Sequence, residues 1–111
     1  MVRPTKFEIE PQTNGTRLTL SIAGELDMST VDTLAQHVDR HIQATTTSLT
    51  LDLRELTFMD SSGVRLLVAL SHRSEQARWQ LRLIPSRHET ATVVLRATGA
   101  DVALPFEKPG E

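Results

Sequence analysis

Apolar and polar residues alternate along three stretches of the chain, which is the pattern of a half-buried β-strand. The alternation covers residues 16–23, 48–53 and 79–83, where every second side chain is apolar. A shorter strand is expected over residues 6–10, and Asn14-Gly15 is typical of a turn that joins two antiparallel strands. The chain therefore predicts an N-terminal β-hairpin followed by two further strands.

Between the strands, apolar residues recur every three or four positions, as on an amphipathic helix. Ser29 is the expected N-cap of a first helix that reaches about Ile42, since Asp32 stands three residues later. A second helix is expected from Val64 to about Leu70, and a third from Ser86. The expected apolar faces consist of Val31, Leu34, Ala35, Val38 and Ile42 in the first helix, Val64, Leu67 and Val68 in the second, and Val93, Val94 and Ala97 in the third.

The C-terminal part of the chain carries the signals that end secondary structure. Pro85 ends the strand over residues 79–83, and Gly99 stands where a helix C-cap glycine belongs. A short final strand is expected over residues 102–106, at a sheet edge because it contains proline. The tail over residues 109–111 is expected to be frayed.

The order of these elements predicts a single α/β domain. Strand–helix–strand connections form right-handed crossovers, so the sheet of about four or five strands is expected to be mostly parallel, with an antiparallel N-terminal hairpin. Alternating strands, unlike continuous apolar ones, indicate that helices cover mainly one face of the sheet. We expect one domain over residues 1–111, with an ordered core from about residue 5 to residue 106.

Composition and charge narrow the possible functions. The chain has 39% hydrophobic residues, a net charge of −2 and no basic cluster, which argues against a nucleic-acid partner. It contains no cysteine, so disulfides and thiolate metal sites are excluded. No apolar stretch approaches the roughly 18 residues of a membrane span. We expect a cytoplasmic protein that does not enter membranes.

The candidate chemistry lies in residues 58–63, Phe-Met-Asp-Ser-Ser-Gly, between an expected strand and the second helix. A helix start presents unpaired N–H groups and favours negative charge. Asp60 or Ser61 can be the helix cap there, and one cap is enough. The adjacent hydroxyls of Ser61 and Ser62 leave three interpretations open: a cap, a nucleophile or an acceptor of a phosphoryl group.

Catalysis and metal binding are poorly supported by the same sequence. A nucleophile elbow requires Gly-x-Ser-x-Gly, but Met59 stands two residues before Ser61. His72 and His88 are not placed by the sequence near that serine. The pair His37 and His41, four residues apart, lacks a third ligand, and no nucleotide-binding glycine motif is present. We expect neither an enzyme nor a bound cofactor.

Two segments resemble the bacterial anti-sigma factor antagonists of the STAS domain family. Residues 51–53 together with residues 58–64 are similar to the family's signature, and Gly24-Glu25-Leu26-Asp27 is similar to a second segment. The expected order of elements fits this family from about residue 5 to residue 106. The resemblance therefore extends over nearly the whole chain.

The resemblance implies a protein that switches partners. In this family the unmodified antagonist binds an anti-sigma factor with serine kinase activity, and this releases a sigma factor. The kinase phosphorylates the first serine of the pair, here Ser61, and a PP2C-type phosphatase restores binding. ATP and magnesium belong to the kinase. The residues expected at the partner interface are Asp27, Asp60, Ser61, Ser62, Gly63 and Arg65.

Arg65 departs from the family, since Gly-Val-Arg follows Ser62 where many relatives have Gly-Leu-Gly, and this departure can alter the choice of partner. Nothing in the chain requires an oligomer, so a monomer is expected. One alternative is a STAS accessory subunit of a lipid or anion transporter, in which Ser61 is unmodified. Another is a small esterase, which requires ester turnover that depends on Ser61.

Overall fold

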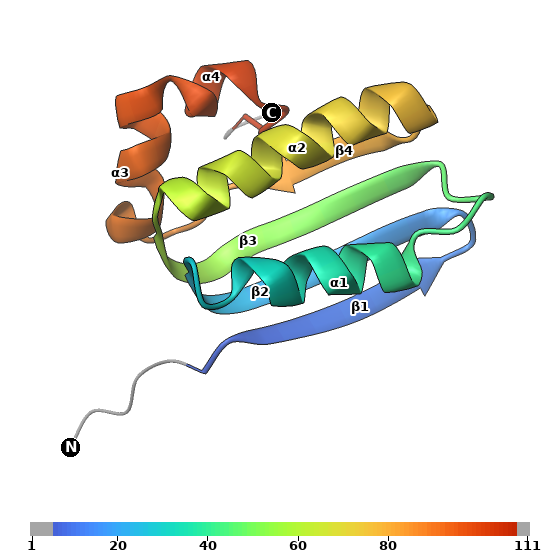
Figure 1. Ribbon diagram of the computed structural model, residues 1–111, viewed down its shortest axis with the longest axis horizontal. Coiled ribbons are helices and arrows are strands. Elements are labelled where there is room, and N and C mark those ends of the chain that lie inside the picture. The colour runs from blue at the N-terminus through green and yellow to red at the C-terminus, as the bar shows by residue number, and fades with distance from the viewer. Residues whose placement is uncertain (1–5, 109–111) are drawn as a thin grey trace.

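The computed structural model describes residues 6–108 and contains one four-stranded sheet, in the order β1-β2-β3-β4 (Figure 1). Strands β1 and β2 pair antiparallel, whereas β2–β3 and β3–β4 pair parallel. This arrangement confirms the predicted α/β fold with an antiparallel N-terminal hairpin. The strands are β1 Glu8–Asn14, β2 Arg17–Leu26, β3 Ser48–Met59 and β4 Gln80–Ile84, and the helices are α1 Val31–His41, α2 Ser61–Ala77, α3 Glu89–Thr98 and α4 Ala100–Ala103.

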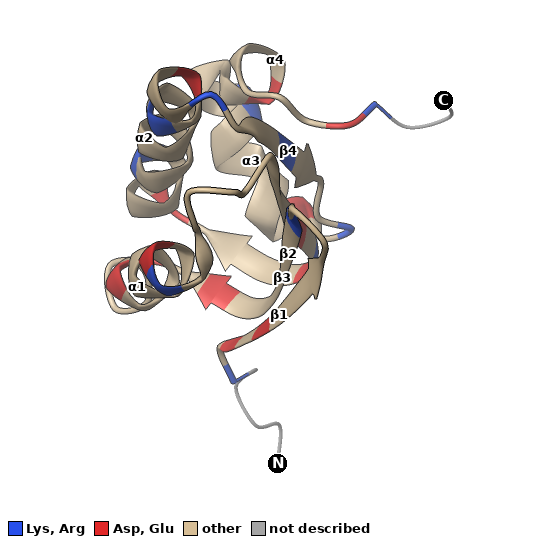
Figure 2. Ribbon diagram, turned by 90° about the vertical axis from the view of Figure 1, so that its right-hand side faces the viewer, with Lys and Arg blue, Asp and Glu red and all other residues tan. Residues whose placement is uncertain are grey.

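Helices α1 and α2 lie side by side over one face of the sheet, while α3 and α4 lie beyond the carboxyl end of β4 (Figures 1 and 2). Arg73 of α2 and Asp39 of α1 form an ion pair of 2.5 Å between the two parallel-lying helices. Leucines of β2 and β3 face these helices and are completely buried. Burial of apolar surface in this layer is the main favourable contribution to folding, at about 25 cal/mol per Å².

Strand β3 contains two β-bulges, seen as two shifts in its register with β2. Along β2 every second residue from Leu18 to Leu26 is buried, whereas the buried positions of β3 change from a spacing of two to a spacing of three after Leu53. They are Leu49, Leu51, Leu53, Leu56 and Met59. Each bulge adds one unpaired residue and restores the inward direction of the next apolar side chain.

These bulges explain why β3 was predicted too short. Its expected end was Leu53, because the residues Arg54-Glu55-Leu56 break the strict alternation. Strand β2 likewise continues to Leu26, beyond its expected end at Ala23. The first strand was also wrong at both ends, since β1 spans residues 8–14 and its side chains are mostly exposed.

The helix starts differ from the sequence-based assignment. The N-cap of α1 is Thr30 in place of Ser29, and α2 begins at Ser61 and continues to Ala77. Helix α3 begins at Glu89 because the hydroxyl of Ser86 is engaged in the turn before it.

The predicted C-terminal strand over residues 102–106 is wrong. Gly99 adopts a left-handed conformation with φ of 76° and ends α3, as predicted, and the chain then forms the short helix α4. Only Phe106 pairs with the sheet, through an isolated bridge to Leu83 of β4. In α3 the buried residues are Ala91 and Leu95; the expected core residues Val93 and Ala97 are exposed, and Val94 is half-buried. The tail over residues 109–111 lies outside the described residues.

Candidate functional site

The first residue of α2 is Ser61, directly after the carboxyl end of β3. Asp60 is the N-cap, and its carboxylate accepts a hydrogen bond of 2.8 Å from the amide of Ser62. Its backbone carbonyl accepts hydrogen bonds from the amides of Gly63 and Val64. The cap is therefore complete without either serine hydroxyl.

The hydroxyl of Ser61 is exposed and makes no hydrogen bond within residues 6–108. Ser62 is half-buried, and its hydroxyl likewise makes no hydrogen bond in the part of the chain that the structure describes. Of the three interpretations of Ser61, the cap belongs to Asp60, so a nucleophile and a phosphoryl acceptor remain.

Gly63 lies on the buried side of α2, where the helix meets β2 and β3. A Cβ atom at this position would lie 2.6 Å from Cγ of Met59 and 3.1 Å from side-chain carbons of Leu26. Glycine thus allows the first turn of α2 to approach the sheet closely. Gly63 is therefore a packing residue that sets how closely the start of α2, including Ser61, approaches the sheet.

The turn between β2 and α1 lies beside this helix start. The amide of Asp60 donates a hydrogen bond of 3.2 Å to the carbonyl of Leu26, the last residue of β2. Asp27 follows directly, and its carboxylate accepts hydrogen bonds from the hydroxyl of Ser29 at 2.6 Å and from its amide at 2.9 Å. The turn is completed by Thr30, whose hydroxyl donates to the carbonyl of Glu25.

Asp27 is held as an anion at this turn. The hydroxyl and then the amide of Ser29 keep the pKa of Asp27 below its ordinary value of 3.8, because both hydrogen bonds stabilise the ionised carboxylate. Carboxylates of Asp27 and Asp60 therefore stand at the carboxyl ends of two neighbouring parallel strands. Ligands commonly bind at this edge of an open α/β sheet.

The site also has two exposed apolar side chains: Met28, which the sequence did not single out, and Val68, which was wrongly expected on the buried face of α2. Met28, at the tip of the turn after β2, is 79% exposed, and Val68 of α2 is 36% exposed. Arg65 is exposed on α2, one turn after Ser61 and one before Val68. A large apolar residue between Asp27 and Ser29 was the available sequence signal for Met28, because polar residues dominate such turns.

The structure offers little for hydrolysis at Ser61. His72 is eleven residues further along α2, about 16 Å along the helix axis. Within the described residues, no histidine forms a hydrogen bond with the serine hydroxyl, as a nucleophile requires.

The two histidines of α1 are stacked, with ring centroids 5.9 Å apart. Burial, followed by the charges of Arg40 and His41, lowers the pKa of His37. Nδ1 of His41 lies 2.8 Å from the carbonyl oxygen of His37. Residues 6–108 contain no group of three or more metal-ligating side chains.

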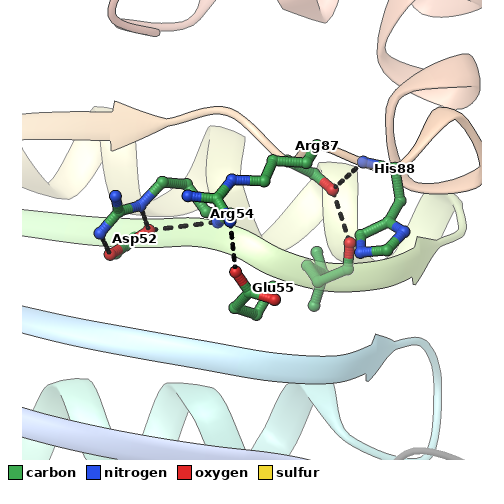
Figure 3. Close-up of polar contacts among 7 residues, drawn as sticks. Asp52, Arg54, Glu55, Arg87 and His88 are labelled. Carbon is green, nitrogen blue, oxygen red and sulfur yellow. Dashed lines mark hydrogen bonds and ion pairs between the residues drawn. The ribbon is translucent and has the colours of Figure 1, made fainter.

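A second polar cluster joins β3 to the loop between β4 and α3 (Figure 3). Arg54 binds Asp52 through two hydrogen bonds of 2.9 and 2.7 Å, and Arg87 binds Glu55 at 3.1 Å. The bidentate contact with Arg54 lowers the pKa of Asp52. The pair of Arg54 with Asp52 lies within β3, and the pair of Arg87 with Glu55 links the loop to that strand.

None of the helices in the described part of the chain combines the length and the apolar character needed to span a bilayer.

Comparisons with known proteins agree with this architecture. The family model described as the STAS domain matches residues 8–108. An anti-sigma factor antagonist from Mycobacterium paratuberculosis has a similar structure, with a TM-score of 0.79 and 20% identity over 95% of this chain and 88% of that one. Among curated proteins, none matches this chain by sequence.

Two further structures are similar. The anti-sigma factor antagonist SpoIIAA in its unphosphorylated form has a TM-score of 0.70 and 20% identity, over 94% of this chain and 90% of that one. The Bacillus cell fate determinant SpoIIAA in its phosphorylated form has a TM-score of 0.66 and 24% identity, over 94% of this chain and 93% of that one. At these identities the likeness establishes the fold.

Proposed function

Because this chain belongs to the STAS domain family, which matches residues 8–108, we propose that it is an anti-sigma factor antagonist. In its unmodified form it binds, as a cytoplasmic monomer, an anti-sigma factor that is also a serine kinase. Phosphorylation of Ser61 dissociates the complex, and a PP2C-type phosphatase restores binding. The observation that carries this proposal is that Ser61, the first residue of α2, is exposed and that its hydroxyl makes no hydrogen bond among the described residues.

The position of Ser61 suits reversible phosphorylation. Transfer forms a bond between Oγ and the γ-phosphorus of ATP, the hydroxyl proton departs, and ADP leaves. The product adds about −1.5 to −2 charges at a helix N-terminus, where the helix dipole favours negative charge. The capping bonds of Asp60 do not involve the modified oxygen, so the fold persists after modification.

The same charge acts differently on a partner that covers the site. Asp27 and Asp60 already place two carboxylates at this edge of the sheet, and a phosphate brings a third anionic group between them and the partner. Such like-charge contacts in an interface cost several kcal/mol. Apolar contact through Met28, which is 79% exposed, provides binding energy only while the interface can close.

The direct test is phosphorylation by the candidate kinase from the same genome with ATP, followed by mapping of the phosphate by mass spectrometry. We expect modification of the wild type at Ser61 and none of Ser61→Ala. Ser62→Ala is the matched control, since it removes the neighbouring hydroxyl and leaves the acceptor in place. Phosphate on Ser62 or on another residue, with Ser61→Ala modified normally, would contradict the proposal.

A further inference from the structure

We propose that Arg65 is the internal counter-ion of phosphorylated Ser61, binding the phosphate across one turn of α2. This inference rests on the proposed function, which supplies the phosphate. It assigns Arg65 a role in the modified state of the same chain, beyond any contact with a partner.

The helix geometry brings the two side chains together. Ser61 and Arg65 are four residues apart on α2, and both are exposed. Side chains of a helix lean towards its N-terminus, so the long side chain of Arg65 extends over the turn that begins with Ser61. An anion followed by a cation four residues later is the favoured order on a helix.

Arg65 has no anionic partner among the described residues. None of the ion pairs within residues 6–108 includes it, whereas Arg73 on the same helix pairs with Asp39. The first turn of α2 contains no acidic residue, and the carboxylate of the N-cap Asp60 is engaged with the amide of Ser62. A cation near a helix N-terminus is opposed by the helix dipole unless an anion lies close by.

Helix α3 has an acidic first residue paired with an arginine further along the helix, an arrangement that α2 lacks before modification. Its first residue, Glu89, forms an ion pair with Arg96 two turns later. A phosphate on Ser61 places an anion at the equivalent first position of α2. Arginine suits this role because its planar guanidinium can donate two parallel hydrogen bonds to phosphate oxygens.

The test uses protein with phosphoserine introduced at position 61 during translation, so that no kinase is needed. The second pKa of the phosphate is measured by ³¹P NMR titration at low ionic strength. We expect this pKa to be about 0.2–0.4 units higher in Arg65→Gln than in the wild type, the shift that corresponds to an exposed pair four residues apart. About 1 M salt should remove the difference.

Two further variants separate the pair from other effects. Arg65→Lys keeps the charge without the guanidinium. The second pKa of its phosphate should lie between those of the wild type and Arg65→Gln. Arg40→Gln makes the same change in net charge on the other helix, nine residues or about 14 Å after the first residue of α1. The phosphate in this variant should have the same pKa as in the wild type. The helix dipole acts on every variant alike, so equal midpoints for the wild type and Arg65→Gln would overturn the proposal.

The two proposals can fail separately. A kinase that never modifies Ser61 defeats the proposed function, while the titration still measures whether Arg65 pairs with a phosphate there. Equal titration midpoints defeat the pair alone and leave the mapped phosphate unaffected. Because Arg65 is exposed and in no ion pair of the described residues, Arg65→Gln is expected to fold normally.

Discussion

Helices α2 and α3 begin at the carboxyl ends of neighbouring parallel strands, yet their first turns use polar side chains in opposite ways. At the start of α3, the hydroxyl of Ser86 bonds to the carbonyl of Leu56, and that of Thr90 bonds to the carbonyl of Thr57. At the start of α2, the side chain of Asp60 makes the cap, and the hydroxyl of Ser61 has no hydrogen-bond partner in the described part of the chain.

The difference teaches where regulation can be added to a fold without loss of stability. The hydroxyls of Ser86, before α3, and Thr90, in its first turn, attach the helix to β3, so any modification of them breaks contacts of the native state. Ser61 is exposed, and its hydroxyl makes no hydrogen bond with the rest of residues 6–108. A charged group can therefore be added there, and its consequences fall on binding.

The largest expected effect is on partner binding at the start of α2. Ser61→Asp should lower the affinity for the anti-sigma factor about 100-fold or more, because a like-charge contact in the interface costs several kcal/mol. Its free energy of unfolding should stay within about 0.5 kcal/mol of the wild type. Calorimetric binding and urea unfolding measure the two quantities. An unfolded Ser61→Asp protein would show that the site cannot hold a charge.

An intermediate effect, on stability alone, is expected at the start of α3. Ser86→Ala removes the hydroxyl that donates to the carbonyl of Leu56 at 2.5 Å and accepts from the amide of His88 at 2.9 Å. The loss should be about 1–3 kcal/mol in urea unfolding, because both backbone groups lose a partner. Ser62→Ala is the control and should be nearly neutral. A Ser86→Ala protein as stable as the wild type would remove the contrast between the two helix starts.

The smallest effect concerns the pH dependence of stability at Asp27. Its pKa in the folded protein lies below 3.8, so its contribution is complete above that value and is lost as the pH falls through the folded pKa. Asp27→Asn should therefore be less stable than the wild type near neutral pH, and the difference should vanish in strong acid. Thermal unfolding between pH 7 and about pH 2 measures it. If the difference in stability between the wild type and Asp27→Asn does not change with pH, the effect does not come from ionisation of Asp27.

Much of the fold could be predicted because the local signals agree with the final packing. The alternation along β2 and the position of Gly99 correspond to observed elements, and the hairpin turn expected at Asn14-Gly15 lies one residue later, at Gly15-Thr16. The acceptor candidate Ser61 was also found from sequence, since a serine pair next to an aspartate exceeds what capping requires. The structure adds that, between residues 6 and 108, its hydroxyl forms no hydrogen bond.

What sequence could not provide depends on contacts between distant segments. The bulges of β3 exist only in relation to the register of β2, and no pattern within residues 54–59 distinguishes them from a loop. Ser86 is a good N-cap residue, but its bond to Leu56, thirty residues earlier, moves the start of α3 to Glu89. The burial of Gly63 likewise depends on Leu26 and Met59, which lie on separate strands.

Because of the two bulges of β3, the number of residues between Leu53 and Ser61 determines which side chains face the core. Substitutions on the solvent side of this segment leave the direction of the chain unchanged as it leaves the sheet. Removing a single residue should instead shift every later side chain of the strand to the opposite face and take Met59 out of the core. We therefore expect this segment to tolerate changes in residue type and not changes in residue count.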